Sequence, residues 1–464
     1  MTANLTTGSP LKRIFLFSIP FLIGNLFQQF YNIADMIIVG RVLDNMAYTA
    51  VGSTSSLVWF SSGAIQSLTI GFSVVTASFF GAGDEESIKK SFGAAIKLSA
   101  IISVALSLVC TVFARPILEL LRYPADIIDR SHRYIVWIFA GLVATALFNL
   151  LSNMIRGLGD SRTPLYFLVA ACVINIILDF VFIAVLGMDT DGAGLATVVA
   201  QLISGLSCVV YIKKKQPLLH VKKKHFKRDG ALNRRLIRVG IPMAFLNMVL
   251  SVGGIIMQFV TNGLGTLFVS SMTTGSKIET FVTQPILSFG SAVSVFTAQN
   301  HGAKKYSRIL EGSRKTLLMC FAWCIIASLL LLPLGRVVIR LVAADVVDEI
   351  VNNAYMYICI NTILCLVVSP LVIHKNVLQA TGRTFWAMIS GFTEIFGRAG
   401  LSIVVMFLAS EAVAVIDQQT AFFIMCFASP LAWLFGFLTI LPDYISLGIG
   451  LKKKIKEEKA SLSE

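Results

Sequence analysis

Charged residues are scarce in this chain. Lys, Arg, Asp and Glu together make up 14% of its 464 residues, whereas 56% of the residues are hydrophobic. The mean hydropathy is +0.79. A soluble fold of this length needs far more polar surface than such a composition provides. The composition therefore excludes a soluble protein and indicates an integral membrane protein.

Several kinds of chemical site are also missing. The eight cysteines all fall inside apolar stretches, where cysteine behaves as a small hydrophobic residue, and they form neither a disulfide framework nor a zinc spacing. No strand, glycine-rich loop and helix are arranged as in a phosphate-binding loop. We therefore expect no cofactor and no ATPase motif. If the chain moves a solute across the membrane, an ion gradient would have to drive that movement.

Long apolar stretches are abundant. About twelve of them reach the roughly 20 residues that a helix needs to cross the hydrocarbon core. This pattern predicts an all-α polytopic membrane protein. The approximate spans are 14–39, 51–80, 93–114, 134–155, 164–187, 193–212, 239–261, 270–299, 316–335, 351–378, 386–409 and 420–446.

The basic residues are concentrated in alternate loops. Residues 213–238 hold eleven Lys or Arg, whereas the turns near 188–192, 262–266 and 410–419 hold none. The positive-inside rule then predicts a multi-pass protein of the cell membrane with both termini in the cytoplasm. A basic loop of this kind favours anionic lipid headgroups as its contacts rather than nucleic acid.

One connection, 115–133, departs from this charge rule. It lies on the predicted outer side and yet carries four arginines: Arg115, Arg122, Arg130 and Arg133.

The chain repeats itself after about 222 residues. Ile19-Pro20 and Asn25 recur as Ile241-Pro242 and Asn247, and later pairs recur at nearly the same offset. Each copy holds six spans, so both enter the membrane from the same face. The repeat predicts two six-helix bundles related by a pseudo-two-fold axis along the membrane normal. The expected organisation is a first bundle over 1–212, a basic cytoplasmic linker over 213–238 and a second bundle with a basic tail over 239–464.

Polar residues in the first span follow a helical spacing. Asn25, Gln28, Asn32 and Asp35 are three, four and three residues apart, so they share one stripe of an apolar helix. In the second copy the last three positions are Leu250, Gly254 and Met257. Because the repeat keeps the helix without this polarity, packing alone does not require the stripe. We expect it to face a wet path.

A second acidic pattern lies in the fifth span. Asn175 and Asp179 are four residues apart among Ile, Leu, Val and Phe. A carboxylate inside the membrane costs about 2.5 to 3.5 kcal/mol on insertion scales, so it marks a functional site by default. Counting alternating spans places Thr197 and Tyr134 at a similar depth. We predict that these groups converge with Asp35 in the outer half of the membrane.

Two carboxylates, an amide oxygen and a hydroxyl suit a hard cation such as Na⁺. The same carboxylates, desolvated and repelling one another, could equally bind H⁺. A structural alternative is that Asp179 only hydrogen-bonds to Thr197 and fixes two helices. Asn149 and Asn153 are further candidates for the surrounding network or cavity.

Other charges inside spans have a structural interpretation. Glu394 and Arg398 are four apart on one helix and could neutralise each other. Lys277 and Glu279 are two apart and point to different faces, so either could reach a cavity.

The residues together resemble the multidrug and toxic compound extrusion (MATE) family. The resemblance rests on Asp35 in the first span, Gly81-Ala82-Gly83-Asp84, Arg156-Gly157-Leu158-Gly159-Asp160, and Asn175 and Asp179 followed by Thr197. It implies an antiporter that exports amphipathic, often cationic compounds against Na⁺ or H⁺. The family's cation site carries over to Asp35, Asn175, Asp179 and Thr197, with Tyr134 in the network around it.

Three rival functions differ in what they require. A flippase for a lipid-linked saccharide should line its cavity with Arg or Lys, and the spans of the first half lack such a cluster. A membrane-embedded enzyme needs a constellation of His, Ser or paired acids, and the five histidines show no metal spacing. The duplicated halves disfavour a receptor. The expected partners are small amphipathic molecules and the lipid bilayer, without nucleic acid, and we expect a monomer.

Overall fold

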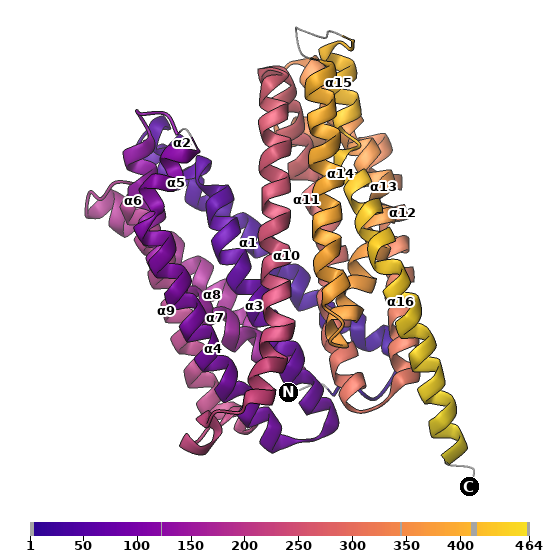
Figure 1. Cartoon of the computed structure of the whole chain (residues 1–464). Helices are drawn as coiled ribbons and strands as arrows, with labels where there is room; N and C mark the ends of the chain where they lie inside the picture. Colours follow the sequence, from indigo (N-terminus) through magenta and orange to yellow (C-terminus); the bar gives the residue numbers. More distant parts are fainter. Residues whose placement is uncertain (1–3, 122, 344–345, 410–414, 462–464) are drawn as a thin grey trace. The chain divides into compact units, whose positions relative to one another are not determined.

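The computed structural model describes residues 4–121, 123–343, 346–409 and 415–461. Within these ranges the chain is helical with short connections and contains no strand, so the all-α prediction is confirmed (Figure 1). The helices up to residue 215 are α1 (Pro10–Val42), α2 (Asn45–Ser53), α3 (Ser55–Ala82), α4 (Glu85–Val112), α5 (Ala114–Leu120), α6 (Ile128–Ala140), α7 (Leu142–Gly157), α8 (Arg162–Asp179), the π-helix η1 (Phe180–Val185) and α9 (Thr190–Lys215). The helices after residue 215 are η2 (Pro217–Leu219), η3 (Lys223–Phe226), α10 (Gly230–Gly263), α11 (Thr266–Gly302), α12 (Tyr306–Val342), α13 (Asp348–Ala380), α14 (Phe385–Leu408), α15 (Gln418–Met425) and α16 (Ala428–Ser461).

Membrane-spanning length is reached repeatedly. In the described part of the chain, 11 helices are long and apolar enough to cross a membrane, and the number rises to 12 if α6 and α7 form one bent span. These two helices meet at 45° next to Gly141, in the predicted span 134–155. A Cβ at Gly141 would lie 2.1 Å from the Val198 side chain on α9. Val198 therefore packs directly against the backbone of Gly141, and a larger residue at this position would clash with it. The prediction of about twelve spans is confirmed.

Helix ends are fixed by side chains that the sequence places there. Asp84 caps α4 by accepting a hydrogen bond from the Ser87 backbone NH at 2.9 Å, and Asp44 caps α2 in the same way through Ala47. Gly83 ends α3 with a φ of +74°, a left-handed conformation that suits glycine. Asp44 and Asp84 therefore define where α2 and α4 begin, and Gly83 defines where α3 ends.

The helices fall into two compact units. The first unit comprises 1–7, 16–248 and 298–304, and the second comprises 8–15, 249–297 and 305–464. The basic linker and the first part of α10 thus pack with the first unit. Each unit has its own apolar core: Phe72, Phe92 and Met154 are central to the first, and Phe268, Tyr357 and Phe422 to the second.

The basic linker is docked on α4. Leu219 and His225 are buried, and the Lys97 side chain on α4 donates a hydrogen bond to the carbonyl of Phe226. Lys224 forms an ion pair with Glu86 at 3.1 Å. The linker is therefore a structured part of the first unit, with most of its lysines at the surface.

Two glycines allow a close backbone contact within the first unit. A Cβ at Gly81, in the last turn of α3, would lie 1.8 Å from the carbonyl oxygen of Gln299 on α11. A Cβ at Gly302 would lie 1.7 Å from the carbonyl oxygen of Ser78. The Gln299 side chain also donates to the carbonyl of Gly157 at 2.9 Å and accepts from the backbone NH of Leu5 at 3.1 Å. Only glycine fits at these two positions.

We expect Gly302→Ala to destabilise the protein, because the added methyl group must push α11 away from α3. Overpacking of this kind costs about 1–3 kcal/mol. The midpoint of thermal unfolding in detergent should fall by several degrees. Gly448→Ala on α16 is the matched control, since a Cβ there meets no atom within 4 Å in the described structure. Equal midpoints for the two variants would contradict the contact.

Candidate functional site

The predicted acidic residues of the first unit lie together in its interior. Asp35 on α1, Asn175 and Asp179 on α8, and Tyr134 on α6 have exposed fractions of 6%, 1%, 0% and 6%. Asp179 is the last residue of α8 before the helix widens into η1, a π-helix of the kind often found at functional sites. We call Asp35, Asp179, Asn175, Thr197, Tyr31 and Tyr134 the carboxylate site.

The hydroxyl of Thr197 links three helices at this site. It lies 3.1 Å from the Tyr31 hydroxyl of α1 and accepts a hydrogen bond from Asn175 Nδ2 of α8 at 3.4 Å. No described hydrogen bond joins Asp179 to Thr197, and both Asp179 oxygens lack a protein partner in the described structure. The alternative in which Asp179 only fixes Thr197 is therefore wrong. Thr197 instead positions Tyr31 and Asn175.

Four oxygens of the carboxylate site have no donor. They are Asp35 Oδ1, Asn175 Oδ1 and both Asp179 oxygens, and no hydrogen-bond partner for them exists among the described residues. The carboxyl groups of Asp35 and Asp179 also interact electrostatically. Buried oxygens without donors are costly unless a cation or a proton satisfies them. The residues present therefore fit a bound Na⁺ or a bound proton.

Tyr31 is a site residue that the sequence analysis did not select. Its hydroxyl contacts Thr197, and it interacts electrostatically with both Asp35 and Asp179. A signal was available in the sequence, because Tyr31 precedes Asp35 by four residues and so shares its helix face.

The predicted polar stripe on α1 is only partly assembled. Gln28 is exposed and Asn25 is half-buried, while the side chain of Asn32 lies outside the described residues. On α7, Asn153 is buried and donates to Thr69 at 3.0 Å, whereas Asn149 is half-buried. None of the hydrogen bonds described for these side chains reaches the carboxylate site. Of the four residues in the stripe, only Asp35 is shown to belong to the carboxylate site.

Charges in the second unit pair differently from the prediction. Glu394 accepts a hydrogen bond from Lys375 of α13 at 2.6 Å, and Arg398 interacts electrostatically with Glu279. The predicted neutralisation of Glu394 by Arg398 is therefore wrong. The physical reason is that Lys375 of the neighbouring helix α13 reaches Glu394 within ion-pair distance, whereas no described ion pair joins Glu394 to Arg398. Lys277, on α11, is exposed.

Glu279 is held by a second contact. The hydroxyl of Tyr357 on α13 donates to Glu279 Oε2. Tyr357 and Lys375 are thus the functional partners that sequence reasoning missed in this unit. They lie far from Glu279 and Glu394 along the chain, so no local spacing could have indicated them.

The arginines that departed from the charge rule are neutralised. The hydrogen bond from Arg130 lowers the pKa of the Asp44 carboxyl, which therefore stays charged into the acidic range. Arg122 lies outside the described residues. The other pairs are Arg115 with Asp129 at 2.8 Å and Glu119 at 3.2 Å, Arg130 with Asp44 at 2.7 Å and Asp189 at 3.1 Å, and Arg133 with Asp189 at 3.8 Å.

A many-span helical fold with a buried carboxylate site inside one unit defines a polytopic membrane transporter. The MatE family model matches residues 20–181 and 242–408, and the chain belongs to this family. The resemblance stated from the sequence is therefore confirmed.

Individual relatives agree with this assignment. The probable multidrug resistance protein YoeA of Bacillus subtilis is 27% identical over 421 residues, covering 89% of each chain. YpnP, a probable multidrug resistance protein of the same organism, is 25% identical over 426 residues, covering 89% of this chain and 95% of its own. These relatives are transporters and not enzymes.

The fold is also found among solved structures. A structure described as the outward-facing conformation of a multidrug resistance MATE family transporter of the MOP superfamily matches with a TM-score of 0.86. It is 18% identical and covers 98% of this chain and 99% of its own. Nothing in these comparisons supports the flippase alternative.

Proposed function

We propose that this protein is a cation-coupled antiporter that exports amphipathic, often cationic compounds by alternating access. One observation carries the proposal: four buried oxygens of the carboxylate site have no protein donor in the described structure. Burying such groups inside a membrane bundle costs free energy, and a bound ligand must compensate for this cost. The names of the relatives from Bacillus subtilis support multidrug substrates as the class to test.

The donor set favours Na⁺ as the coupling ion. Asn175 Oδ1 is one of the four unpaired oxygens, and a neutral amide oxygen can coordinate a hard cation but gains little from a proton on a carboxylate. Bound Na⁺ would supply positive charge between the carboxyl groups of Asp35 and Asp179. The Tyr31 and Asn175 contacts to Thr197 would hold the site open in this geometry.

A proton is the second candidate for the coupling ion. The electrostatic interaction of Asp35 and Asp179 supports it, because two neighbouring buried carboxyl groups favour holding one proton over being ionised together. In this case Asp179 would hold the proton on one oxygen and Asp35 would accept from it. The two candidates differ in whether lowering the pH or adding Na⁺ drives transport.

Coupling follows from competition between cation and substrate. If the cation favours one conformation of the first unit and the substrate favours another, each ligand weakens the binding of the other. The protein itself then needs no ATP. We further propose that it acts as a monomer in the cell membrane with both termini in the cytoplasm.

Proteoliposomes test this function. We expect ethidium, an amphipathic cationic dye, to be transported when an opposing Na⁺ gradient is imposed at equal pH on both sides. Transport should collapse when the gradient is removed with an ionophore selective for Na⁺. Transport driven only by a pH gradient would identify H⁺ instead, and transport that persists without either gradient would contradict cation coupling.

A further inference from the structure

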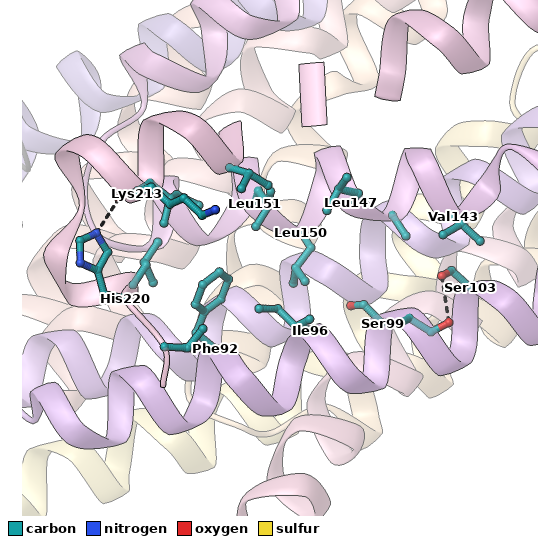
Figure 2. Close-up of a pocket in the computed structure, with 16 residues that line it drawn as sticks. Phe92, Ile96, Ser99, Ser103, Val143, Leu147, Leu150, Leu151, Lys213 and His220 are labelled. Atoms are coloured by element: carbon teal, nitrogen blue, oxygen red, sulfur yellow. Dashed lines mark hydrogen bonds between the residues drawn. The ribbon is translucent and has the colours of Figure 1, made fainter. Parts of the chain in front are cut away.

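A cavity lies in the first unit, lined by none of the residues of the carboxylate site. It has a volume of about 460 Å³ and is formed by α4, α7, α9 and the basic linker (Figure 2). Its walls are almost entirely apolar, and central contributions come from Phe92, Ile96, Leu147, Leu150 and Val209. The cation-coupling function leaves this cavity unexplained.

The cavity has one basic end and one apolar end. Lys213, in the last turn of α9, and His220 of the linker line the first end, and Val143 of α7 lies at the other (Figure 2). His220 Nε2 lies 3.0 Å from the carbonyl oxygen of Ile212, which fixes the imidazole beside Lys213. Lys214 and Lys215 extend the exposed positive charge beyond the cavity. The basic end can therefore receive an anionic group.

The dimensions of the cavity match one leaflet of a membrane. It follows α4 from Phe92 to Ser103. At a rise of 1.5 Å per residue this path is about 16 Å long, close to half of the roughly 30 Å hydrocarbon core. Its border is open to the apolar surface of the unit, because two lining residues, Ala100 and Val143, are exposed, the latter to 40%. An acyl chain can enter from that side.

One polar group faces this apolar space. Ser99 is 3% exposed, its hydroxyl lines the cavity, and it has no hydrogen-bond partner in the described part of the protein. Ser103, one turn further along α4, satisfies its own hydroxyl through the carbonyl of Ala100 at 3.2 Å. A partner for Ser99 must therefore come from whatever fills the cavity.

We propose that this cavity binds an anionic phospholipid from the leaflet that meets the basic end of α9. The phosphate lies beside Lys213 and His220, and one acyl chain follows α4 past Ile96 towards Ser103. The ligand is a membrane lipid rather than an exported compound, because the site combines an anion-binding end with a leaflet-length apolar groove. The lipid stabilises the first unit by binding to its folded state only.

The test measures the binding of phosphatidylglycerol with a fluorescent acyl chain to the full-length protein in neutral detergent. Phosphatidylcholine with the same chains is the comparison. We expect phosphatidylglycerol to bind at least about fivefold more tightly, and this preference to shrink as salt screens the basic end. Equal affinity for both lipids would overturn the proposal.

Two variants locate the binding. Ala100→Trp places a large ring in the groove at an exposed position of α4, and Lys213→Gln removes the charge at its basic end. Each should weaken phosphatidylglycerol binding at least about fivefold. Ala105→Trp on the same helix and Lys214→Gln on α9 are matched controls at exposed positions that do not line the cavity, and they should bind as the wild type does.

Three results would count against the site. Wild-type affinity in both Ala100→Trp and Lys213→Gln would show that the lipid binds elsewhere. If the two control variants weakened phosphatidylglycerol binding as much as Ala100→Trp and Lys213→Gln do, the lipid would be responding to the general charge and bulk of the surface and not to this cavity. Binding of ethidium that Ala100→Trp removes while phosphatidylglycerol binding persists would assign the cavity to exported compounds instead.

Discussion

Asp179→Asn is expected to abolish cation-coupled export while leaving the protein folded. Asp179 is fully buried, and neither of its oxygens accepts a hydrogen bond from a described residue. Its carboxylate therefore stabilises no described contact within the protein. Replacing it with a neutral amide removes one of the two negative charges that attract the cation. A unit charge about 4 Å from a carboxylate interacts with it by roughly 4 kcal/mol at the effective dielectric of a protein, so cation affinity should fall about 100-fold or more. Asp35→Asn should have the same effect.

Proteoliposome transport of ethidium under a Na⁺ or pH gradient measures this loss. The control is Asp129→Asn, which removes an exposed carboxylate of the same unit that pairs with Arg115. It should transport at the wild-type rate. A double variant Asp35→Asn, Asp179→Asn that transports as the wild type does would disprove the assignment of the carboxylate site.

Lys375→Met should be the most destabilising single change in the second unit. Lys375 and Glu394 form an ion pair at 2.6 Å, and their side chains are only 12% and 6% exposed. Removing the lysine leaves the buried Glu394 carboxylate without its partner. Breaking a buried pair from one side costs about 3–5 kcal/mol, whereas replacing both partners together is often nearly neutral. The double variant Lys375→Met, Glu394→Gln should therefore recover most of the lost stability.

The midpoint of thermal unfolding in detergent gives the comparison. Lys315→Met is the matched control, because Lys315 pairs with Glu311 at the surface, where the two side chains are 37% and 45% exposed. An exposed helix pair of this kind contributes about 0.3–0.5 kcal/mol. If Lys375→Met lowered the midpoint no more than Lys315→Met does, the buried ion pair would contribute no more to stability than an exposed one.

The parts of the site that could be predicted are those that depend on spacing within one helix. Asn175 and Asp179 are four residues apart, and this alone places them on one face of α8. Their convergence with Asp35 was predicted by counting alternating spans, and all three side chains are buried in the structure. The cation that these residues hold stays a prediction.

Contacts between helices could not be predicted in the same way. Lys375 and Glu394 lie on α13 and α14, and the charge nearest to Glu394 along its own helix, Arg398, interacts with Glu279 of α11 instead. A spacing of four residues shows that a pair is possible. It does not show which of several nearby helices brings a stronger partner.

The difference between the two copies of the repeat now has a structural meaning. Met257, the counterpart of Asp35, is a partly buried residue packed against the apolar core of the second unit. The second copy uses for packing the position that the first copy uses for a buried charge. Its own charges, the half-buried Glu279 and the buried Glu394, instead accept hydrogen bonds from Tyr357 and Lys375.

The most direct test of the account is whether a cation displaces bound substrate through Asp35 and Asp179. Purified protein is loaded with ethidium, and dye release is followed by fluorescence anisotropy as Na⁺ replaces choline at fixed pH, and separately as the pH is lowered at fixed Na⁺. Wild-type protein should release the dye on one of these additions, and the double variant Asp35→Asn, Asp179→Asn should retain it. Release that is identical in the two proteins, or no cation-dependent release from the wild type, would contradict the account.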